Sequence, residues 1–540
     1  MLGILTSRKV AHITATQQNL VADTASTGNP LWDIWVNSFD ITKMLNTSDI
    51  DPNQDVDKKH PPVPAARTTD DASAVQHVPS LLNVAMIDEA VNKTVALANA
   101  PGAVLRAGFS QPFRVAVTLS NLRGIPFTIK NMQPYGGFTG SAFVEHDDFA
   151  WFAFPNGAAP ADNKREDEFW LSSNPGVGEA DFSVLGEFAA ASGSLPIGLP
   201  ARYLQRPAEH YLYRPSVRAV ATPPGYSIDY PPPAPDWSEL PDVLAAGSYT
   251  FSAVDGGCFN NDPVKLVHRA LAGMVGVNPQ DASEANRAML MIDPLADQPS
   301  QLPLSGRSVV RVLGDLAGLF TQGGRYLTAD MDLFRDADVF SRFQLVPTQT
   351  GGRVGEQAVA GASLMALAGW FAREFRVHDF LLGRANMKKF LETEFVLAGN
   401  NSLFDKWSQH QRDQFAVDKS GNKVNILHLA PDQYLLPILP DLTAADSAPL
   451  PAWPDGACSP DDFQEPIRQR LDAVLKQLQA DNLKGPLAAV MAFIAVPLTT
   501  NLLASAVVKM LTDQLSKAGL MGNAPPSTPK VKIEQNSGHQ

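Results

Sequence analysis

Alternation of apolar and polar residues predicts several strands in the first half of the chain. The stretch 113–121 (FRVAVTLSN) alternates and is rich in β-branched side chains, and 139–154 (TGSAFVEHDDFAWFAF) continues in the same manner. Two further runs, 247–257 (GSYTFSAVDGG) and 286–295 (NRAMLMIDPL), have the same character. Because side chains alternate between the two faces of a strand, we expect each of these stretches to lie in a sheet.

Apolar residues at helical spacing predict helices between these strands. Residues 78–100 and 181–193 have this spacing, and the second helix is expected to end at Gly193. A third helix is expected over 264–275. One face of that helix would carry Val264, Val267, Leu271 and Met274. The order of strand, helix and strand across 247–295 predicts an α/β unit with parallel pairing.

The C-terminal part of the chain has a different character. The stretches 309–320, 354–375 and 466–483 are helical by spacing, and the last has the clearest apolar stripe. That stripe consists of Ile467, Leu471, Val474, Leu475 and Leu478. The chain is therefore expected to have three parts. They are an α/β core over 1–310, a mainly helical extension over 311–521 and a disordered tail over 522–540.

Two polar stretches are expected to be exposed loops. Residues 49–71 are polar and acidic and end in HPPVPAARTTDD. Residues 222–236 (TPPGYSIDYPPPAPD) are rich in proline, which excludes a helix or a central strand because proline lacks the backbone N–H.

Composition excludes several classes of function. Hydrophobic residues make up 44% of the 540 residues and charged residues 18%, which suits a globular protein with a sizeable core. The net charge is −13 and there is no run rich in Lys and Arg, so we expect no nucleic-acid partner. Cys258 and Cys458 are the two cysteines, too few for a disulfide framework. No His or Cys spacing typical of a metal site occurs, and we expect neither metal nor cofactor.

One uncharged stretch has the length of a membrane span. Residues 486–508 lie between Lys484 and Lys509, but Pro497 and Asn501 interrupt the apolar run. We interpret this stretch as two buried helices or a lipid-facing hairpin. The first twenty residues, MLGILTSRKVAHITATQQNL, lack the features of a signal peptide.

The loop after the third predicted strand is the main candidate for chemistry. Asp255 follows that strand and precedes Gly256 and Gly257, which can take positive φ angles without cost. Asn260 and Asn261 also tolerate left-handed turns, so the loop is suited to aiming one carboxylate.

The beginning of the next helix offers a ready cap. Asp262 or Asn261 is expected to cap it, and Pro263 suits its first turn. In the simpler interpretation, the whole loop is a strand-to-helix turn in which Asp255 accepts backbone hydrogen bonds.

The loop sequence VDGGCFNNDP resembles the Asp-Gly-Gly/Asn-Asn motif of patatin-like phospholipases. Three other blocks resemble a bacterial subgroup of that family with a helical C-terminal extension: 117–127 (VTLSNLRGIPF), 189–202 (AAASGSLPIGLPAR) and 369–391 (GWFAREFRVHDFLLGRANMKKFL). The similarity covers about 31–391. It implies a three-layer α/β/α core and a Ser–Asp dyad in which Asp255 is the base. In such a dyad, a serine attacks an ester carbonyl and the carboxylate accepts its proton.

The other half of that dyad is not found in this sequence. The family places its serine on a Gly-x-Ser-x-Gly elbow. Ser110, Ser141, Ser194 and Ser363 lie near glycines, but none has glycine both two before and two after it. Ser363 comes nearest and lies within a predicted helix. No Gly-Gly-Gly-x-Arg type of oxyanion loop is present either. Since both elements lie near the N-terminus in the family, we expect the core to be truncated at its start and the nucleophile to lie outside this chain.

Several other residues have a structural interpretation beside a functional one. His146 and His378 are expected to form structural hydrogen bonds rather than to act in catalysis, because the dyad needs no histidine. Cys258 is interpreted as a small apolar loop filler rather than a reactive thiol. Arg123 could bind a lipid phosphate, but pairing with an acidic residue is preferred.

The resemblance implies a lipid acyl hydrolase that cleaves carboxylic esters of phospholipids or related lipids. Such an enzyme would be cytoplasmic or in peripheral contact with a membrane. A second hypothesis is a non-catalytic lipid-binding or interaction protein that has lost the nucleophile.

Overall fold

A computed structural model describes most of the chain. The described residues are 27–50, 80–100, 109–132, 138–155, 164–172, 180–212, 214, 218–222, 225–229, 235–273, 276–296, 334, 336, 338–349, 351–363, 366–440, 450–480 and 500–522. The first twenty residues, the stretch 309–320 and the expected tail after Gly522 lie outside them. So do 51–71 of the first predicted loop and 486–499 of the long apolar stretch.

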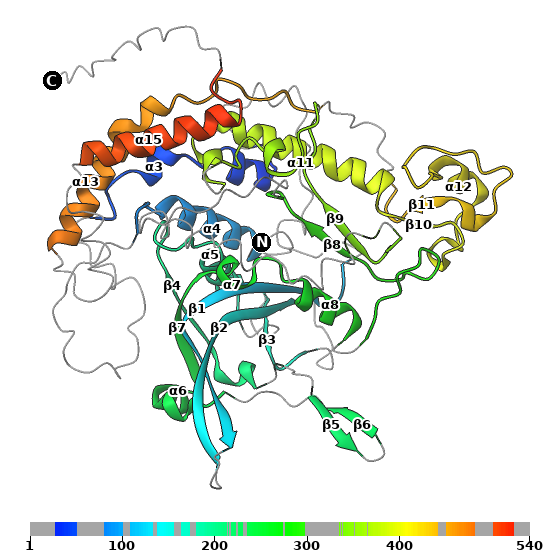
Figure 1. Ribbon diagram of the computed structural model, residues 1–540, viewed down its shortest axis with the longest axis horizontal. Coiled ribbons are helices and arrows are strands. Elements are labelled where there is room, and N and C mark those ends of the chain that lie inside the picture. The colour runs from blue at the N-terminus through cyan, green and yellow to red at the C-terminus, as the bar shows by residue number, and fades with distance from the viewer. Residues whose placement is uncertain are drawn as a thin grey trace.

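Helices and strands alternate irregularly along the described chain (Figure 1). The α-helices are α3 (Ile41–Met44), α4 (Ala85–Ala98), α5 (Phe182–Ser192), α6 (Pro241–Ala246), α7 (Gly257–Asn260), α8 (Val264–Ala272), α11 (Arg373–Thr393), α12 (Gln409–Phe415), α13 (Gln464–Ala480) and α15 (Thr500–Lys517). The strands are β1 (Phe113–Met132), β2 (Phe138–Phe154), β3 (Glu168–Trp170), β4 (Arg202–Pro207), β5 (Arg218–Thr222), β6 (Gly225–Asp229), β7 (Ser248–Asp255), β8 (Met289–Ile292), β9 (Arg342–Leu345), β10 (Val396–Ala398) and β11 (Leu435–Pro437).

The largest sheet in the described part has five strands in the order β3-β2-β1-β7-β4. The pairs β1–β2, β1–β7 and β4–β7 are antiparallel, whereas β2 and β3 are parallel, so the sheet is mixed. This arrangement is a general α/β fold. The four strand predictions in the first half are confirmed, and so are the helix over 85–98 and the end of α5 at Gly193.

A β-bulge interrupts the pairing of β1 with β2 between Ser120 and Ile125. Gly124 takes φ +79° there, a left-handed conformation that suits glycine. The Asn121 side chain closes the bulge, because its Oδ1 accepts a hydrogen bond from the Gly124 N–H at 2.9 Å. Tyr249 of β7 donates from its hydroxyl to the Gly124 carbonyl at 2.6 Å. The bulge therefore has a fixed shape in the middle of the sheet.

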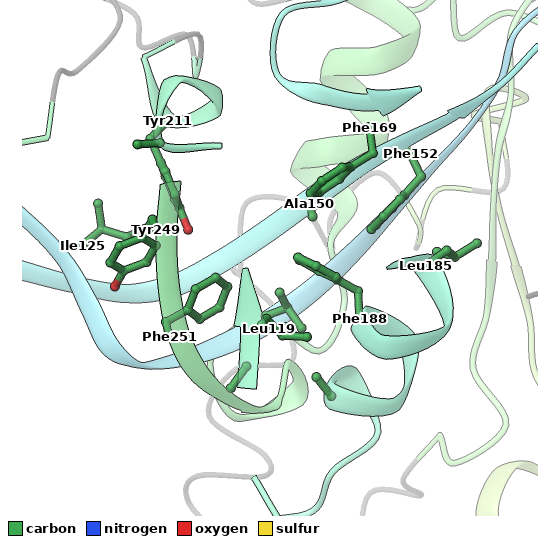
Figure 2. Close-up of a cluster of buried hydrophobic side chains, with 14 of the residues drawn as sticks. Leu119, Ile125, Ala150, Phe152, Phe169, Leu185, Phe188, Tyr211, Tyr249 and Phe251 are labelled. Atoms are coloured by element: carbon green, nitrogen blue, oxygen red, sulfur yellow. The ribbon is translucent and has the colours of Figure 1, made fainter. Parts of the chain in front are cut away.

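An aromatic cluster fills the space between the sheet and α5 (Figure 2). Phe152 of β2 is fully buried and stacks on Phe169 of β3, with ring centroids 5.2 Å apart. Phe188 of α5 meets Phe152 edge to face at 5.4 Å. Burying one such ring contributes about 1.5–3 kcal/mol, so this cluster accounts for the packing of α5 on the sheet.

Further helices lie beyond α5 (Figure 1). α4 packs on α5, α3 contacts α4, and α13 packs against α15. A second apolar cluster joins these layers and includes Met44, Ala90, Ile467 and Val508. The stripe predicted for the helix at 466–483 therefore faces this core through Ile467. Within the described residues, no helix is long and apolar enough to cross a membrane.

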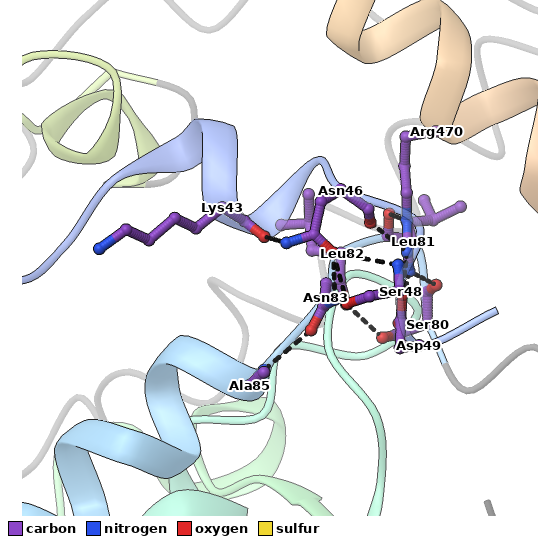
Figure 3. A network of polar contacts seen from close by, with 10 residues as sticks. All are labelled: Lys43, Asn46, Ser48, Asp49, Ser80, Leu81, Leu82, Asn83, Ala85 and Arg470. Carbon is purple, nitrogen blue, oxygen red and sulfur yellow. Dashed lines mark hydrogen bonds and ion pairs between the residues drawn. The ribbon is translucent and has the colours of Figure 1, made fainter. Parts of the chain in front are cut away.

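Arg470 of α13 ties the C-terminal helices to the N-terminal part of the fold (Figure 3). Its side chain is almost fully buried. It donates hydrogen bonds to the backbone carbonyls of Leu81, Asn46 and Ser80 at 2.9, 2.8 and 3.0 Å, and it pairs with Asp49. Arg470 thus binds the main chain near residues 46 and 80–81 to helix α13, which lies 389–424 residues later in the sequence.

Two predictions of local structure are wrong. β7 and β8 do not pair in one parallel unit: β7 lies inside the five-stranded sheet, and β8 pairs with β9 in a separate two-stranded sheet. The stretch 354–375 is not one helix, since it holds two short 3₁₀ turns before α11 begins at Arg373. Its alanines gave helical spacing, but Gly355 takes φ +61° and Gly361 approaches Gly369 closely, which a continuous helix cannot accommodate.

Two other predictions hold in part. The proline-rich stretch 222–236 contains strand β6, although in a separate two-stranded hairpin and not in a central position. In α8, Val264 is buried as expected, but Leu266 is the second buried residue and Val267 is 37% exposed. The apolar face of α8 is therefore rotated from the predicted one. Among the described residues after 338, helices predominate, together with three short strands.

Candidate functional site

Asp255 is the last residue of β7, and its backbone is held from two neighbouring segments. Its N–H donates to the Ser194 carbonyl at 2.9 Å, and its carbonyl accepts from the Ser120 hydroxyl at 2.6 Å. In the register of the sheet, Asp255 lies opposite Leu119 of β1. The main chain at the end of β7 is thus fixed before the loop begins.

The Asp255 carboxylate is only partly engaged. Its Oδ1 accepts a hydrogen bond from the Gly257 N–H at 2.8 Å. Within the described part of the chain, no hydrogen bond or ion pair involves its Oδ2. Burial raises the pKa of Asp255, and the Gly257 hydrogen bond only partly offsets that rise. A half-buried carboxylate with one oxygen fixed and a raised pKa is chemically suited to accept a proton.

The two glycines after Asp255 act differently from the prediction. Gly256 has φ −62°, and neither glycine takes a positive φ. The reason for glycine at 256 is space, because a Cβ there would lie 2.4 Å from the Thr118 carbonyl oxygen of β1. At Gly257, a Cβ would lie 2.9 Å from Asn261 Oδ1 and 3.1 Å from Asp255 Oδ1. The loop is therefore shaped by close approach to β1.

The two asparagines also differ from the prediction. Asn261 has a right-handed conformation with φ −70°, and Asn260 belongs to the short helix α7. The Asn260 side chain acts to lower the pKa of Asp147 of β2, against the larger effect of burial. Neither Asp262 nor Asn261 caps α8, which begins after Pro263 without a side-chain cap. The short helix α7 thus replaces the expected turn, and Asn261 and Asp262 lie between α7 and α8.

Cys258 lies within α7 beside Asp255 and is half-buried. Burial raises the pKa of its thiol, the Asp255 charge raises it further, and a hydrogen bond with Ser120 lowers it by less. The thiol is therefore protonated at neutral pH and a weak nucleophile.

The histidine predictions agree with the structure. The His146 Nδ1–H donates to the Asn121 carbonyl at 2.6 Å. The ring of His146 stacks with that of Phe259 at 6.3 Å between centroids. His378 is buried on α11, where its Nδ1 bonds Asp379 at 2.8 Å and its Nε2 accepts from Gln349 at 3.0 Å. Both rings form structural hydrogen bonds.

Arg123 forms an ion pair, as preferred. Both carboxylate oxygens of Asp242 lie 2.8 Å from its Nη2, and its Nη1 donates to the Thr250 carbonyl at 2.8 Å. The guanidinium also lies over the Tyr249 ring.

A buried charge network beside the site was missed by sequence reasoning. Asp148 is fully buried, accepts from Tyr211 at 2.7 Å and Asn121 at 3.0 Å, and pairs with Arg206 and Arg214. Burial alone would raise the pKa of Asp148, but the two arginines and these hydrogen bonds hold it below its ordinary value. The only signal in the sequence was the doubled aspartate in EHDDF, and it does not reveal which aspartate points inward.

The two neighbouring acidic residues of β2, Asp147 and Glu145, have raised pKa values, in contrast to Asp148. Burial raises the pKa of Asp147 and of Glu145, and nearby Asp148 raises both further. For Asp147, the nearby Asn260 amide and the charges of Arg214 and Lys265 only partly offset this rise in pKa. The α7 region is thus bordered by half-buried carboxyl groups.

Within the described part of the chain, no hydrogen bond joins the hydroxyl of a serine near these glycines to the Asp255 carboxylate. The Ser110 hydroxyl donates to Pro112, and the Ser194 hydroxyl donates to Ala190. Ser363 lies in a turn and not in a helix, and the side chain of Ser141 lies outside the described residues. Among the described residues, no group of three or more His, Cys, Asp or Glu side chains could hold a metal ion.

Comparison with known proteins gives one distant relative. The chain is similar to an uncharacterized protein, y4iI, of Sinorhizobium fredii (strain NBRC 101917 / NGR234), with 26% identity over 372 residues. The aligned region covers 64% of this chain and 51% of the relative, so the chain spans about half the length of the curated relative it matches. No family model matches the sequence, and no solved structure is significantly similar.

Proposed function

We propose that this chain carries the base of a lipid acyl hydrolase of the patatin-like type. The observation that supports the proposal is the state of Asp255. Its backbone is fixed by Ser194 and Ser120, one carboxylate oxygen is oriented by Gly257, and burial raises its pKa. A general base needs this combination, because its geometry must be set in advance and its proton affinity must be increased.

In this mechanism, Asp255 accepts the proton of a serine hydroxyl as that oxygen attacks the ester carbonyl of a lipid. Oδ2 is the candidate proton acceptor, since Oδ1 already accepts the Gly257 N–H. The proton then passes to the leaving alcohol, and water completes the hydrolysis of the acyl-enzyme. The serine lies outside these 540 residues in this proposal, together with the remainder of a three-layer core. The substrates are phospholipids or related lipid esters, which implies peripheral contact with a membrane.

A non-catalytic lipid-binding protein is the second candidate. It is favoured by the fact that, within the described residues, no serine hydroxyl bonds the Asp255 carboxylate. In that case, Asp255 serves only to accept the Gly257 N–H in the turn.

The test is fatty-acid release from phospholipid vesicles by the gene product purified from its own cells. The variants are Asp255→Asn and, as a matched control, Asp293→Asn, since Asp293 is a buried aspartate that directly follows strand β8. We expect Asp255→Asn to lower the rate by about a hundredfold or more, and the control to retain it. Vesicle binding without release by the wild type would support the second candidate. Equal rates in wild type and Asp255→Asn would refute the role of Asp255.

A further inference from the structure

His378 of α11 is buried at a point where three segments of the chain meet, and it is 2% exposed. Its Nδ1 atom lies 2.8 Å from Asp379 Oδ1, and its Nε2 atom lies 3.0 Å from the amide nitrogen of Gln349. The same amide nitrogen donates to the Pro451 carbonyl at 2.8 Å. The ring therefore connects α11 to the loop around Gln349 and, through that residue, to the segment 450–456.

These contacts determine the protonation state of the ring. The Pro451 carbonyl can only accept a hydrogen bond, so the Gln349 side chain must present its NH2 group to it. His378 Nε2 faces the same NH2 group and is therefore an acceptor without a hydrogen. Nδ1 then carries the hydrogen and donates it to Asp379. The three hydrogen bonds are compatible only with a neutral imidazole.

A proton added to Nε2 makes this set of hydrogen bonds impossible. The new N–H points at the Gln349 NH2 group, and two donors then face each other. The amide can rotate to present its oxygen to the imidazolium, and a charge-assisted hydrogen bond of this kind is stronger than a neutral one. After that rotation, the amide oxygen faces the Pro451 carbonyl, and two acceptors cannot bond. Protonation of His378 therefore breaks the contact between Gln349 and Pro451.

The loop around Gln349 is the fixed side of this contact. Thr348 exchanges two hydrogen bonds with the Asn386 side chain of α11, at 2.7 and 2.9 Å. The Gln349 N–H donates to the Arg353 carbonyl at 2.9 Å and closes the loop. The loop thus stays on α11 whether or not Gln349 bonds Pro451, and the segment that is freed is 450–456.

The segment 450–456 is attached to the chain that follows α15. Trp453 Nε1 donates to the Gly519 carbonyl and the Gly456 N–H donates to the Leu520 carbonyl, each at 2.9 Å. On its other side, the Trp453 ring stands edge to face on the His378 ring, with centroids 5.1 Å apart. The segment therefore joins the end of α15 to the buried histidine.

The charged groups around His378 come from two elements. On α11, Asp379 bonds the ring, and Glu374 lies one turn earlier. In the loop, the Arg353 guanidinium lies 3.7 Å from the centroid of the Trp453 ring. Within the described residues, neither the segment 450–456 nor α15 contributes a charged side chain that bonds the histidine. Protonation leaves the Asp379 contact intact, because Nδ1 keeps its hydrogen.

We propose that His378 is a pH-operated latch for the segment 450–456. In its neutral form it fixes the Gln349 amide in the orientation that bonds Pro451, and its protonation releases the segment from α11. The effect is a local opening beside the end of α15. It does not depend on the function proposed for Asp255.

The experiment measures amide hydrogen exchange of the segment 450–456 in the full gene product at about pH 8 and about pH 5. Histidine is the side chain whose charge ordinarily changes between these values. Each rate is divided by the intrinsic rate of an unstructured peptide at the same pH. Losing one hydrogen bond raises the open population roughly fivefold, so we expect the protection of this segment, including the Gly456 N–H, to fall about fivefold on acidification.

Two variants remove the latch in different ways. Gln349→Met keeps the length of the side chain but removes the amide, so protection should be low and equal at both pH values. His378→Gln removes the group that titrates, so the difference between the two pH values should disappear. His410→Gln changes an exposed histidine of α12 and is the control, which should keep the wild-type response.

The comparison between pH values decides the proposal. A fivefold loss of protection in wild type and in His410→Gln that is absent from Gln349→Met supports the latch. Equal protection of the wild type at both pH values overturns it, and so does a pH dependence that persists in Gln349→Met. If Gln349→Met fails to fold, His378→Gln decides by the same criterion.

Discussion

Replacement of Gly256 by alanine distinguishes two explanations for glycine at this position. The residue has φ −62° and ψ −25°, a conformation that alanine adopts readily. If conformational freedom alone mattered, Gly256→Ala would stabilise the protein by about 0.4–1 kcal/mol, because alanine restricts the unfolded chain. The close approach of β1 predicts the opposite sign.

The magnitude follows from the distance to β1. The added Cβ would lie 2.4 Å from the Thr118 carbonyl oxygen and 2.5 Å from its carbonyl carbon, and both are backbone atoms inside the sheet. Real Cβ contacts are essentially never below 3.0 Å. The overlap between the added Cβ and Thr118 can therefore be relieved only if the loop or β1 shifts. Overpacking of this kind costs about 1–3 kcal/mol. After the gain of about 0.4–1 kcal/mol from the unfolded state, the middle of the two ranges leaves a net destabilisation of about 1.3 kcal/mol.

The assay is urea denaturation followed by tryptophan fluorescence, with Gly257→Ala as the matched control. At Gly257, the nearest atoms are the side-chain oxygens of Asn261 and Asp255, which can move. We expect the control to change the free energy of unfolding little, while disturbing the carboxylate and lowering any hydrolysis. A Gly256→Ala variant as stable as wild type, or more stable, would refute the packing argument.

Three further changes test the surrounding structure. Asp148→Ala leaves the buried Arg214 without its carboxylate and should lower the free energy of unfolding by about 3–5 kcal/mol. Asp242→Ala breaks a partly exposed ion pair and should lower it by about 1 kcal/mol or less. Urea denaturation measures both. Arg470→Met removes the hydrogen bonds that hold α13 to the N-terminal segments and should increase amide hydrogen exchange in α13 and α15. Arg468 pairs only with Glu465 of its own helix, so Arg468→Met should leave that exchange unchanged. Equal exchange rates in the two variants would contradict the role of Arg470. Because the folded-state pKa of Asp255 is raised, its contribution to stability is present below the unfolded pKa near 3.8 and is lost as the pH rises through the folded value. Asp255→Asn should therefore gain in Tm relative to wild type as the pH rises above the unfolded value, and a difference independent of pH would contradict this.

Local patterns in the sequence predict the elements better than their partners. The alternation in FRVAVTLSN identifies β1, and the helical spacing before Gly193 identifies α5 and its end. The partner of β7 could not be predicted in this way. Its two neighbours, β1 and β4, come from earlier in the chain, and local order suggested β8 instead.

In the candidate site, too, the sequence predicts local features but not those that depend on distant contacts. Asp255 at the end of a strand follows from the sequence, because the strand pattern stops at that residue. The reason for Gly256 does not, since it depends on a carbonyl of Thr118 more than 130 residues away. Asp147 and Asp148 are identical in type and adjacent, but Arg214, Arg206 and Tyr211 around Asp148 lower its pKa while burial raises that of Asp147.

The most direct test of the central claim is labelling of the gene product from its own cells with a fluorophosphonate probe, which reacts with activated serines. We predict that one serine is labelled, that its peptide lies outside these 540 residues, and that Asp255→Asn slows labelling by about a hundredfold or more. The absence of any labelled serine, or labelling at an equal rate in Asp255→Asn, would contradict the assignment of Asp255 as a catalytic base.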